Sequence, residues 1–195
     1  MKPIKVGLLG IGTVGSGTFE VLARNQEEIT RRAGRGIVIT MVADKDLKRA
    51  RKLVGKTAAV TADAFAVVNH PDIDIVIELI GGTTIAQQLI LKAIENGKHV
   101  VTANKALLAT RGNEIMAAAR KHGVMVAFEA AVAGGIPIIK ALREGLTANR
   151  IEWIAGIING TSNFILSEMR ATGVAARLGL RQHRRERRAG RAHLG

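Results

Sequence analysis

Three glycines near the N-terminus have the spacing of a phosphate-binding turn. Gly10, Gly12 and Gly15 follow a short apolar run at residues 6–9. In the spacing G-x-G-x-x-G the first glycine permits a tight turn, the second lets the backbone approach a pyrophosphate, and the third lets a helix pack closely against the strand. The free amides at the start of that helix also favour phosphate. We therefore expect a dinucleotide to bind here; a glycine-rich turn without a ligand is the alternative.

An acidic residue, Asp44, closes the next β-branched run, residues 37–43. In a dinucleotide-binding fold, an acid at this place accepts hydrogen bonds from the adenosine ribose hydroxyls. The alternative is a strand-end aspartate that caps the following turn. Basic residues that would suit a 2′-phosphate come next: Lys45, Lys48, Arg49 and Arg51. The choice between NAD and NADP therefore stays open.

A lysine, Lys105, follows a further β-branched run at residues 99–102. Beside a nicotinamide, a lysine ammonium can donate a proton to a carbonyl oxygen while hydride arrives at the carbonyl carbon. Most lysines are instead solvated on the surface. From the residues alone, the catalytic and the surface interpretations carry equal weight.

The segments that would position these residues alternate between two patterns. Strand-like runs lie at residues 6–9, 37–43, 57–61, 73–80, 99–102 and 124–128, and helical patterns lie at about 15–33, 63–69, 85–96 and 106–122. This alternation predicts an α/β fold with a Rossmann-type doubly wound parallel sheet. Ligands of such sheets bind beyond the C-terminal ends of the strands. The glycine turn, Asp44, residues 81–84, residues 102–105 and Glu129 all follow strand ends, so we expect one shared site.

Composition narrows the class of protein. The chain has 195 residues, 47% of them hydrophobic and 23% charged, which is typical of a globular protein with one domain and part of another. It has no cysteine, so disulfides and thiolate chemistry are excluded and a reducing cytoplasm is expected. The sequence contains no run of 18 apolar residues, so we expect no transmembrane span. The first residues lead directly into a predicted strand, so we expect no signal peptide. The five histidines are scattered and do not have the spacing of metal ligands.

Five segments, in this order, closely resemble bacterial homoserine dehydrogenase: GLLGIGTVGSG, DIDIVIELIGG, GKHVVTANKALLA, FEAAVAGGIPII and INGTSNFIL. The resemblance covers about residues 1–170, and the last four segments are specific to that family. It implies reduction of aspartate 4-semialdehyde to homoserine with NADH or NADPH, on the way to threonine and methionine. It also implies a homodimer formed through substrate-domain strands, most of which are missing from this sequence.

The resemblance implies a role for individual residues. Those that would hold the pyrophosphate are Gly10, Gly12, Thr13, Val14 and Gly15. Thr102 and Lys105 would lie by the nicotinamide, with Lys105 as the catalytic acid and base. Glu129 and the backbone carbonyls of Val132, Gly134 and Ile136 would bind a monovalent cation, usually sodium, because hard cations take oxygen ligands. The alternative for Glu129 is a solvated strand end. The substrate-domain residues Asn159, Gly160 and Thr161 would begin the substrate site.

The resemblance also predicts the domain organisation. Residues 1–133 would form the NAD(P)-binding domain, and residues 134–170 would begin an α+β substrate domain, with a helix to about residue 145 and a strand at 150–158. The family's later glycine-tyrosine-x-glutamate-alanine-aspartate-proline motif and second lysine are absent. In their place residues 171–195 carry seven arginines and one acid, Glu186, within a chain of net charge +13.

This arginine-rich tail is expected to be disordered, or the out-of-frame or truncated end of a dehydrogenase gene, which would impair catalysis. Two alternatives stay open. The chain could be a dinucleotide-binding fragment without catalysis. The tail could instead be a basic arm for nucleic acid, which we regard as the weaker interpretation because most arginine runs are simply solvated.

Overall fold

The computed structural model describes residues 2–156 and 159–173. The contacts of the chain divide it into two compact units, Met1–Thr147 and Ala148–Gly195. Within the described residues, no helix combines the length and the apolar character that a membrane crossing would need.

The first unit is built on a six-stranded sheet. Its strands are β1 (Ile4–Leu9), β2 (Ile37–Ala43), β3 (Ala59–Thr61), β4 (Ile75–Glu78), β5 (His99–Thr102) and β6 (Val126–Ala127). They lie in the order β3-β2-β1-β4-β5-β6, and every neighbouring pair is parallel. This order confirms the predicted Rossmann-type doubly wound sheet. The strand order reverses between β1 and β4, which is where ligands of such sheets bind.

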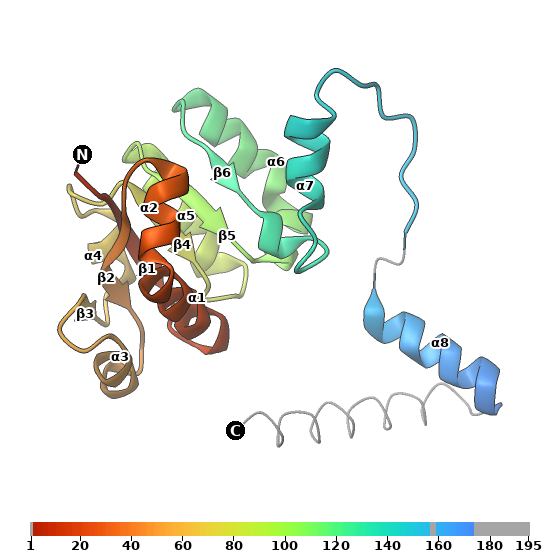
Figure 1. The fold of residues 1–195 in the computed structure, drawn as a ribbon, viewed down its shortest axis with the longest axis horizontal. Helices are drawn as coiled ribbons and strands as arrows, with labels where there is room; N and C mark the ends of the chain where they lie inside the picture. The colour runs from red at the N-terminus through yellow and green to blue at the C-terminus, as the bar shows by residue number, and fades with distance from the viewer. Residues whose placement is uncertain (1, 157–158, 174–195) are drawn as a thin grey trace. The chain divides into compact units, whose positions relative to one another are not determined.

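Helices cover both faces of the sheet (Figure 1). They are α1 (Thr13–Arg24), α2 (Gln26–Ala33), α3 (Leu47–Val54), α4 (Ala64–Val68), α5 (Thr84–Glu95) and α6 (Lys105–Lys121). One hydrophobic cluster joins Leu8 of β1 to α1 and α3, and the other joins Leu9 to α4, α5 and α6. Successive strand residues point to opposite faces. The unbroken apolar run of β1 is therefore explained, because each face of the strand is buried under a different set of helices.

Several elements are shorter than the sequence patterns predict. The helix expected from Gly15 to Gly34 is broken at Asn25, which ends α1 and precedes α2. The strand expected at 73–80 ends at Glu78, because the Glu78 side chain takes the following amides as hydrogen-bond donors. The edge strands β3 and β6 include only the residues that find a partner on β2 or β5.

After β6 the chain forms three short turns of helix: the 3-10 turn η1 (Glu129–Ala131), α7 (Ile138–Lys140) and the π-helical η2 (Ala141–Gly145). They replace the single helix expected up to residue 145. Because α7 contacts both η1 and η2, and η1 contacts β5, the first unit extends to Thr147. The predicted boundary near residue 133 stays a prediction.

The strand expected at residues 150–158 is absent from residues 150–156, and residues 157–158 lie outside the described ones. The described residues of the second unit include no strand with which this segment could pair, and an unpaired strand would leave its backbone groups without partners. The second unit contains one described helix, α8 (Gly160–Thr172). It continues two residues into the predicted tail, and residues 174–195 of that tail lie outside the described residues.

Candidate functional site

The glycine turn follows β1, and its three glycines have different surroundings. Gly10 has a φ of +90°, and a Cβ atom there would lie 2.9 Å from the Leu79 carbonyl oxygen. A Cβ atom on Gly15 would lie 2.1 Å from the carbonyl oxygen of Gly10. Gly12, the N-cap of α1, has open space on its Cβ side, with no atom within 4 Å. Packing inside the protein therefore requires Gly10 and Gly15, whereas Gly12 leaves room for a group from outside.

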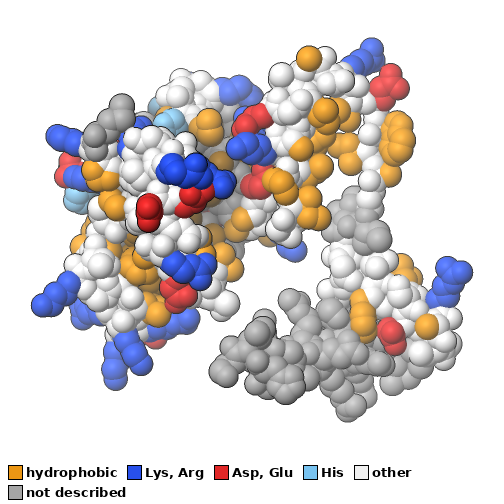
Figure 2. Space-filling view, viewed as in Figure 1, with side chains coloured by type: hydrophobic (Ala, Val, Ile, Leu, Met, Phe, Trp, Pro, Cys, Tyr) orange, Lys and Arg blue, Asp and Glu red, His pale blue; other side chains and the backbone are white. Residues whose placement is uncertain are grey.

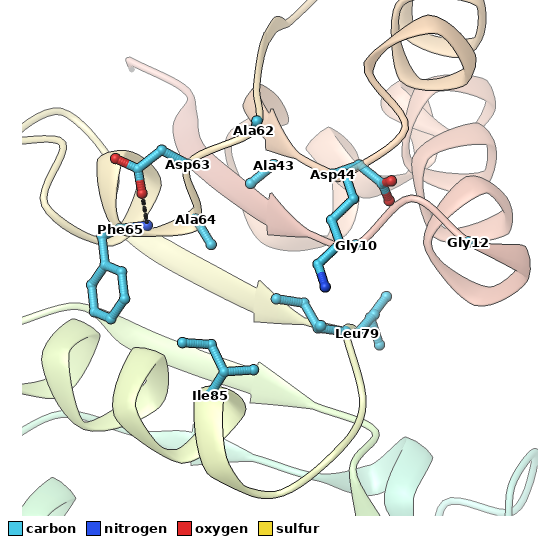
Figure 3. A pocket seen from close by; sticks show the side chains of 12 residues that line it. Gly10, Gly12, Ala43, Asp44, Ala62, Asp63, Ala64, Phe65, Leu79 and Ile85 are labelled. Carbon is cyan, nitrogen blue, oxygen red and sulfur yellow. Dashed lines mark hydrogen bonds between the residues drawn. The ribbon is translucent and has the colours of Figure 1, made fainter.

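A cavity of about 650 Å³ lies beyond the ends of β1, β2 and β4. Its walls are mostly apolar, and the residues that line it are Gly10, Gly12, Ala43, Asp44, Lys45, Ala62, Asp63, Ala64, Phe65, Leu79, Ile80 and Ile85. In Figure 3 Phe65, Leu79 and Ile85 form the wall opposite Asp44. A mainly apolar cleft with a few polar groups, at the switch point of a parallel sheet, is typical of a ligand site.

The Asp44 carboxylate links two turns at the edge of this cavity. Its Oδ2 atom accepts a hydrogen bond from the Ile11 amide at 2.7 Å, and its Oδ1 atom accepts one from the Asp46 amide at 2.8 Å. The carboxylate points toward the loop between Gly10 and Gly12 (Figure 3). The structure thus gives Asp44 the turn-capping role and also places it on the cavity wall, where each oxygen keeps a lone pair for a further donor.

A second cavity, of about 240 Å³, lies beyond the ends of β4 and β5. Its lining residues are Val14, Glu78, Leu79, Gly81, Ala103, Asn104, Lys105 and Ala106. Leu79 lines both cavities, which are therefore neighbours along the C-terminal edge of the sheet. Lys105 is exposed and is the first residue of α6. Its predicted role as a proton donor beside a nicotinamide stays a prediction.

A buried hydrogen-bond network supports the second cavity. Glu78 and Thr102 are both fully buried, and the Thr102 hydroxyl donates to Glu78 Oε2 at 2.7 Å. The same hydroxyl oxygen accepts from the Asn104 amide at 3.0 Å. Thr102, predicted to lie by the nicotinamide, therefore keeps its hydroxyl inside the protein, and its contact with a cofactor stays a prediction. Sequence analysis did not single out Glu78, although it is the one acidic residue within the apolar segment at residues 75–80.

Glu129 is the first residue of η1, two residues after the end of β6, and is half-buried. Its two carboxylate oxygens accept hydrogen bonds from the Ile139 and Lys140 amides, at 2.8 and 2.9 Å. The carboxylate thus caps the start of α7. The other proposed cation ligands, Val132, Gly134 and Ile136, are exposed. Among the described residues no group of three or more histidine and acidic side chains could hold a metal ion. The cation site, which relies on backbone carbonyls, stays a prediction.

The residues predicted to begin the substrate site belong to the second unit. The Asn159 side chain accepts a hydrogen bond from the Ser162 amide at 2.9 Å and so caps the N-terminus of α8. Gly160 and Thr161 form the first turn of that helix. Their contact with a substrate stays a prediction.

Two family sequence models match the chain. The first, described as "Homoserine dehydrogenase, NAD binding domain", matches residues 10–129, and the second, "Homoserine dehydrogenase", matches residues 137–187. The second match continues past Arg170, where sequence analysis placed the end of the resemblance.

Relatives of known sequence and structure agree with these matches. The homoserine dehydrogenase of Pseudomonas aeruginosa is 66% identical over 173 residues, which cover 89% of this chain and 39% of the relative. That of Methylobacillus glycogenes is 63% identical over 175 residues, covering 90% and 42%. The crystal structure of a homoserine dehydrogenase from Thiobacillus denitrificans matches with a TM-score of 0.88 and 65% identity, covering 95% of this chain and 43% of that one.

The chain thus spans about two-fifths of the length of these relatives. The NAD-binding match alone includes more than half of the chain, and it contains the glycine turn, Asp44 and Lys105. On this sequence and structural similarity, the chain belongs to the homoserine dehydrogenase family.

Proposed function

We propose that this chain binds NADH or NADPH along the C-terminal edge of the sheet and presents Lys105 to the reaction of its family, the interconversion of L-homoserine and L-aspartate 4-semialdehyde. The observation that carries the proposal is the pair of neighbouring cavities that share Leu79, together with the open space on the Cβ side of Gly12, which lines the larger cavity.

Each part of the nucleotide has a matching part of the site. The adenosine would occupy the larger cavity, with its ribose hydroxyls donating to Asp44. The pyrophosphate would lie against Gly12 and accept hydrogen bonds from the amides of the first turn of α1, which includes Thr13 and Val14. The nicotinamide would enter the smaller cavity, where Val14 and Lys105 form part of the wall.

The bound nucleotide supplies or accepts the hydride at the substrate's reacting carbon. Lys105 would neutralise the charge that develops on the substrate oxygen. It donates a proton to the carbonyl oxygen when the aldehyde is reduced, and it takes the proton back when homoserine is oxidised. Its position at the rim of the smaller cavity leaves its amine accessible to a substrate that arrives from solvent.

The charges around the larger cavity suit either nucleotide. Asp44 and Asp63 on its wall favour the ribose hydroxyls of NADH and repel a 2′-phosphate. Lys45 lines the same cavity, and Lys48 and Arg49 follow on α3, around which Figure 2 shows several basic side chains. The two nucleotides therefore need to be compared directly.

Titration with NADH and NADPH, followed by the fluorescence of the bound nicotinamide, tests the binding proposal. Asp44→Ala should weaken NADH binding about tenfold, because hydrogen bonds to a charged group are lost. It should weaken NADPH binding less, since the repulsion of the 2′-phosphate is relieved. Asp46→Ala is the matched control: Asp46 caps α3 but does not line the cavity. A folded chain that binds neither nucleotide at millimolar concentration would refute the proposal.

A separate assay of homoserine oxidation tests the catalytic part. Lys105→Met should keep nucleotide binding and abolish turnover. If the unsubstituted chain binds nucleotide but shows no turnover, the alternative of a dinucleotide-binding module without catalysis is favoured. Turnover that survives in Lys105→Met would exclude Lys105 as the acid and base.

The remaining expectations about partners and location belong to this proposal. The lack of cysteine supports action in a reducing compartment such as the cytoplasm. The homodimer of the family is expected of the whole protein, and sodium is expected at Glu129. Sedimentation would show whether this part of the protein already forms a dimer, and exchange of the Ile139 and Lys140 amides with and without sodium would test the cation site.

A further inference from the structure

We infer that the buried carboxylate of Glu78 is a positioning residue that holds both walls of the nicotinamide cavity in place. This inference rests on the proposed function for its ligand, but the network behind it is independent of any ligand. Glu78 is the last residue of β4, which pairs with β5. It is fully buried and belongs to the wall of the 240 Å³ cavity.

The side chain of Glu78 forms three hydrogen bonds, and its carboxylate oxygens are the acceptors in all of them. Oε1 accepts from the amides of Ile80 at 2.9 Å and Gly81 at 3.1 Å, and Oε2 accepts from the Thr102 hydroxyl at 2.7 Å. The residue is fully buried and forms no ion pair with another described residue. A buried carboxylate is costly unless its oxygens are satisfied by donors. Here two backbone amides and one hydroxyl satisfy both oxygens.

The network continues from Thr102 into the loop that carries Lys105. The Asn104 amide donates to the Thr102 hydroxyl oxygen, and the Asn104 side chain donates to the Gly82 carbonyl at 2.6 Å. The Asn104 side chain also accepts from the Leu107 amide at 3.2 Å, which caps α6. The loop after β4 and the loop after β5 are thereby tied to one another, with Lys105 directly after the joint.

The loop after β4 has a shape that needs such support. Gly81 and Gly82 both have positive φ values, 78° and 73°. Glycine visits this region freely, so the two residues gain no preference for it from their own chemistry. The Gly81 amide donates a hydrogen bond to the Glu78 carboxylate, and the Asn104 side chain donates one to the Gly82 carbonyl. These two bonds hold the loop in one conformation. Gly81 itself lines the cavity.

Glutamine cannot replace Glu78 in this arrangement. An amide offers one accepting oxygen and one donating nitrogen. If the side-chain nitrogen of glutamine faces Ile80 and Gly81, its N–H groups point at two backbone N–H groups and no hydrogen bond forms. If it faces Thr102, the hydroxyl hydrogen of Thr102 loses its buried acceptor. Glu78→Gln thus changes no volume but leaves one side of the network unsatisfied, which loosens the loops without opening a hole in the core.

The test compares two ligands, NADH and ADP-ribose, which share the adenosine, the pyrophosphate and both riboses but differ in the nicotinamide. Glu78→Gln should weaken NADH binding at least about fivefold more than ADP-ribose binding, because only NADH uses the smaller cavity. Thr102→Val should have the same selective effect, and Thr102→Ser, which keeps the hydroxyl, should restore NADH binding. Glu114→Gln, an exposed position on α6, is the matched control.

Amide hydrogen exchange gives a readout without any ligand. In Glu78→Gln the amides of Ile80, Gly81 and Asn104 should exchange at least tenfold faster, whereas those of β1 should keep their protection. Equal losses of NADH and ADP-ribose affinity, or unchanged exchange at these three amides, would overturn the inference. If the unsubstituted chain binds neither ligand, the proposed function fails and the exchange result still decides the network. Should Glu78→Gln not fold, Thr102→Val decides, since it leaves the carboxylate and its two loop amides in place.

Discussion

Replacing Gly12 by alanine should weaken nucleotide binding and leave the fold intact. Gly12 has φ −64° and ψ −156°, which an alanine can adopt, and a Cβ atom there would meet no atom within 4 Å. Alanine is a poorer N-cap than glycine, so we expect a loss of about 0.5–1 kcal/mol in the free energy of unfolding. The new methyl group would, however, occupy the space that the pyrophosphate needs.

Two neighbouring glycines supply the controls. A Cβ atom on Gly15 would lie 2.1 Å from the backbone oxygen of Gly10, so the start of α1 would have to move away from the sheet. We expect Gly15→Ala to cost about 3 kcal/mol or more, a large part of the stability of a domain. Gly17 lies inside α1 with open space around it, and Gly17→Ala should stabilise the protein by about 0.5–1 kcal/mol.

Urea unfolding followed by far-ultraviolet circular dichroism measures the three stabilities. The fluorescence of Trp153 is less suitable, because this residue lies in the second unit, outside the sheet domain. Titration with NADH measures binding, and Gly12→Ala should raise Kd at least about tenfold, or about 1.4 kcal/mol. If Gly12→Ala binds NADH as well as the unsubstituted chain does, the glycine turn is not the pyrophosphate site. A Gly15→Ala protein of normal stability would contradict the packing argument.

Two further predictions concern buried and half-buried charges. Burial lowers the pKa of Lys98, partly offset by the charge of Asp74, and its ammonium donates to the carbonyls of His70 and Ile73. Below the unfolded chain's lysine pKa of about 10.4, the unfolded chain then binds more protons than the folded protein does. The stability of the unsubstituted protein relative to Lys98→Met should therefore rise as the pH is raised toward about 10.4; a constant difference in urea midpoints would refute this. Glu129→Gln should cost about 1–2 kcal/mol, since its oxygens accept from two amides of α7, and the Ile139 and Lys140 amides should exchange faster. If sodium protects these amides in the unsubstituted protein but not in Glu129→Gln, the cation site is supported, whereas equal protection in both would exclude Glu129 as its ligand.

The sequence alone predicts those features whose physical cause lies within one segment of the chain. The apolar runs predict the central strands of a doubly wound sheet, because a strand that is buried on both faces consists mostly of apolar residues. The glycine spacing predicts the turn after β1, since Gly10 needs its positive φ and Gly15 its close approach. Asp44 and Lys105 were found by their positions after strand ends, which a parallel sheet brings to one edge.

What remained depends on contacts between distant segments. Glu78 is only one more acid in an apolar run until β4 and β5 pair and bring Thr102 against it. The open side of Gly12 is likewise decided by what the folded chain leaves unfilled. The apolar residues at 150–156 form no strand, because the described residues of their own unit include no strand with which they could pair. Periodicity reports which faces of a segment are buried, whereas a side chain's hydrogen-bond partners and a strand's neighbours are set by the tertiary structure.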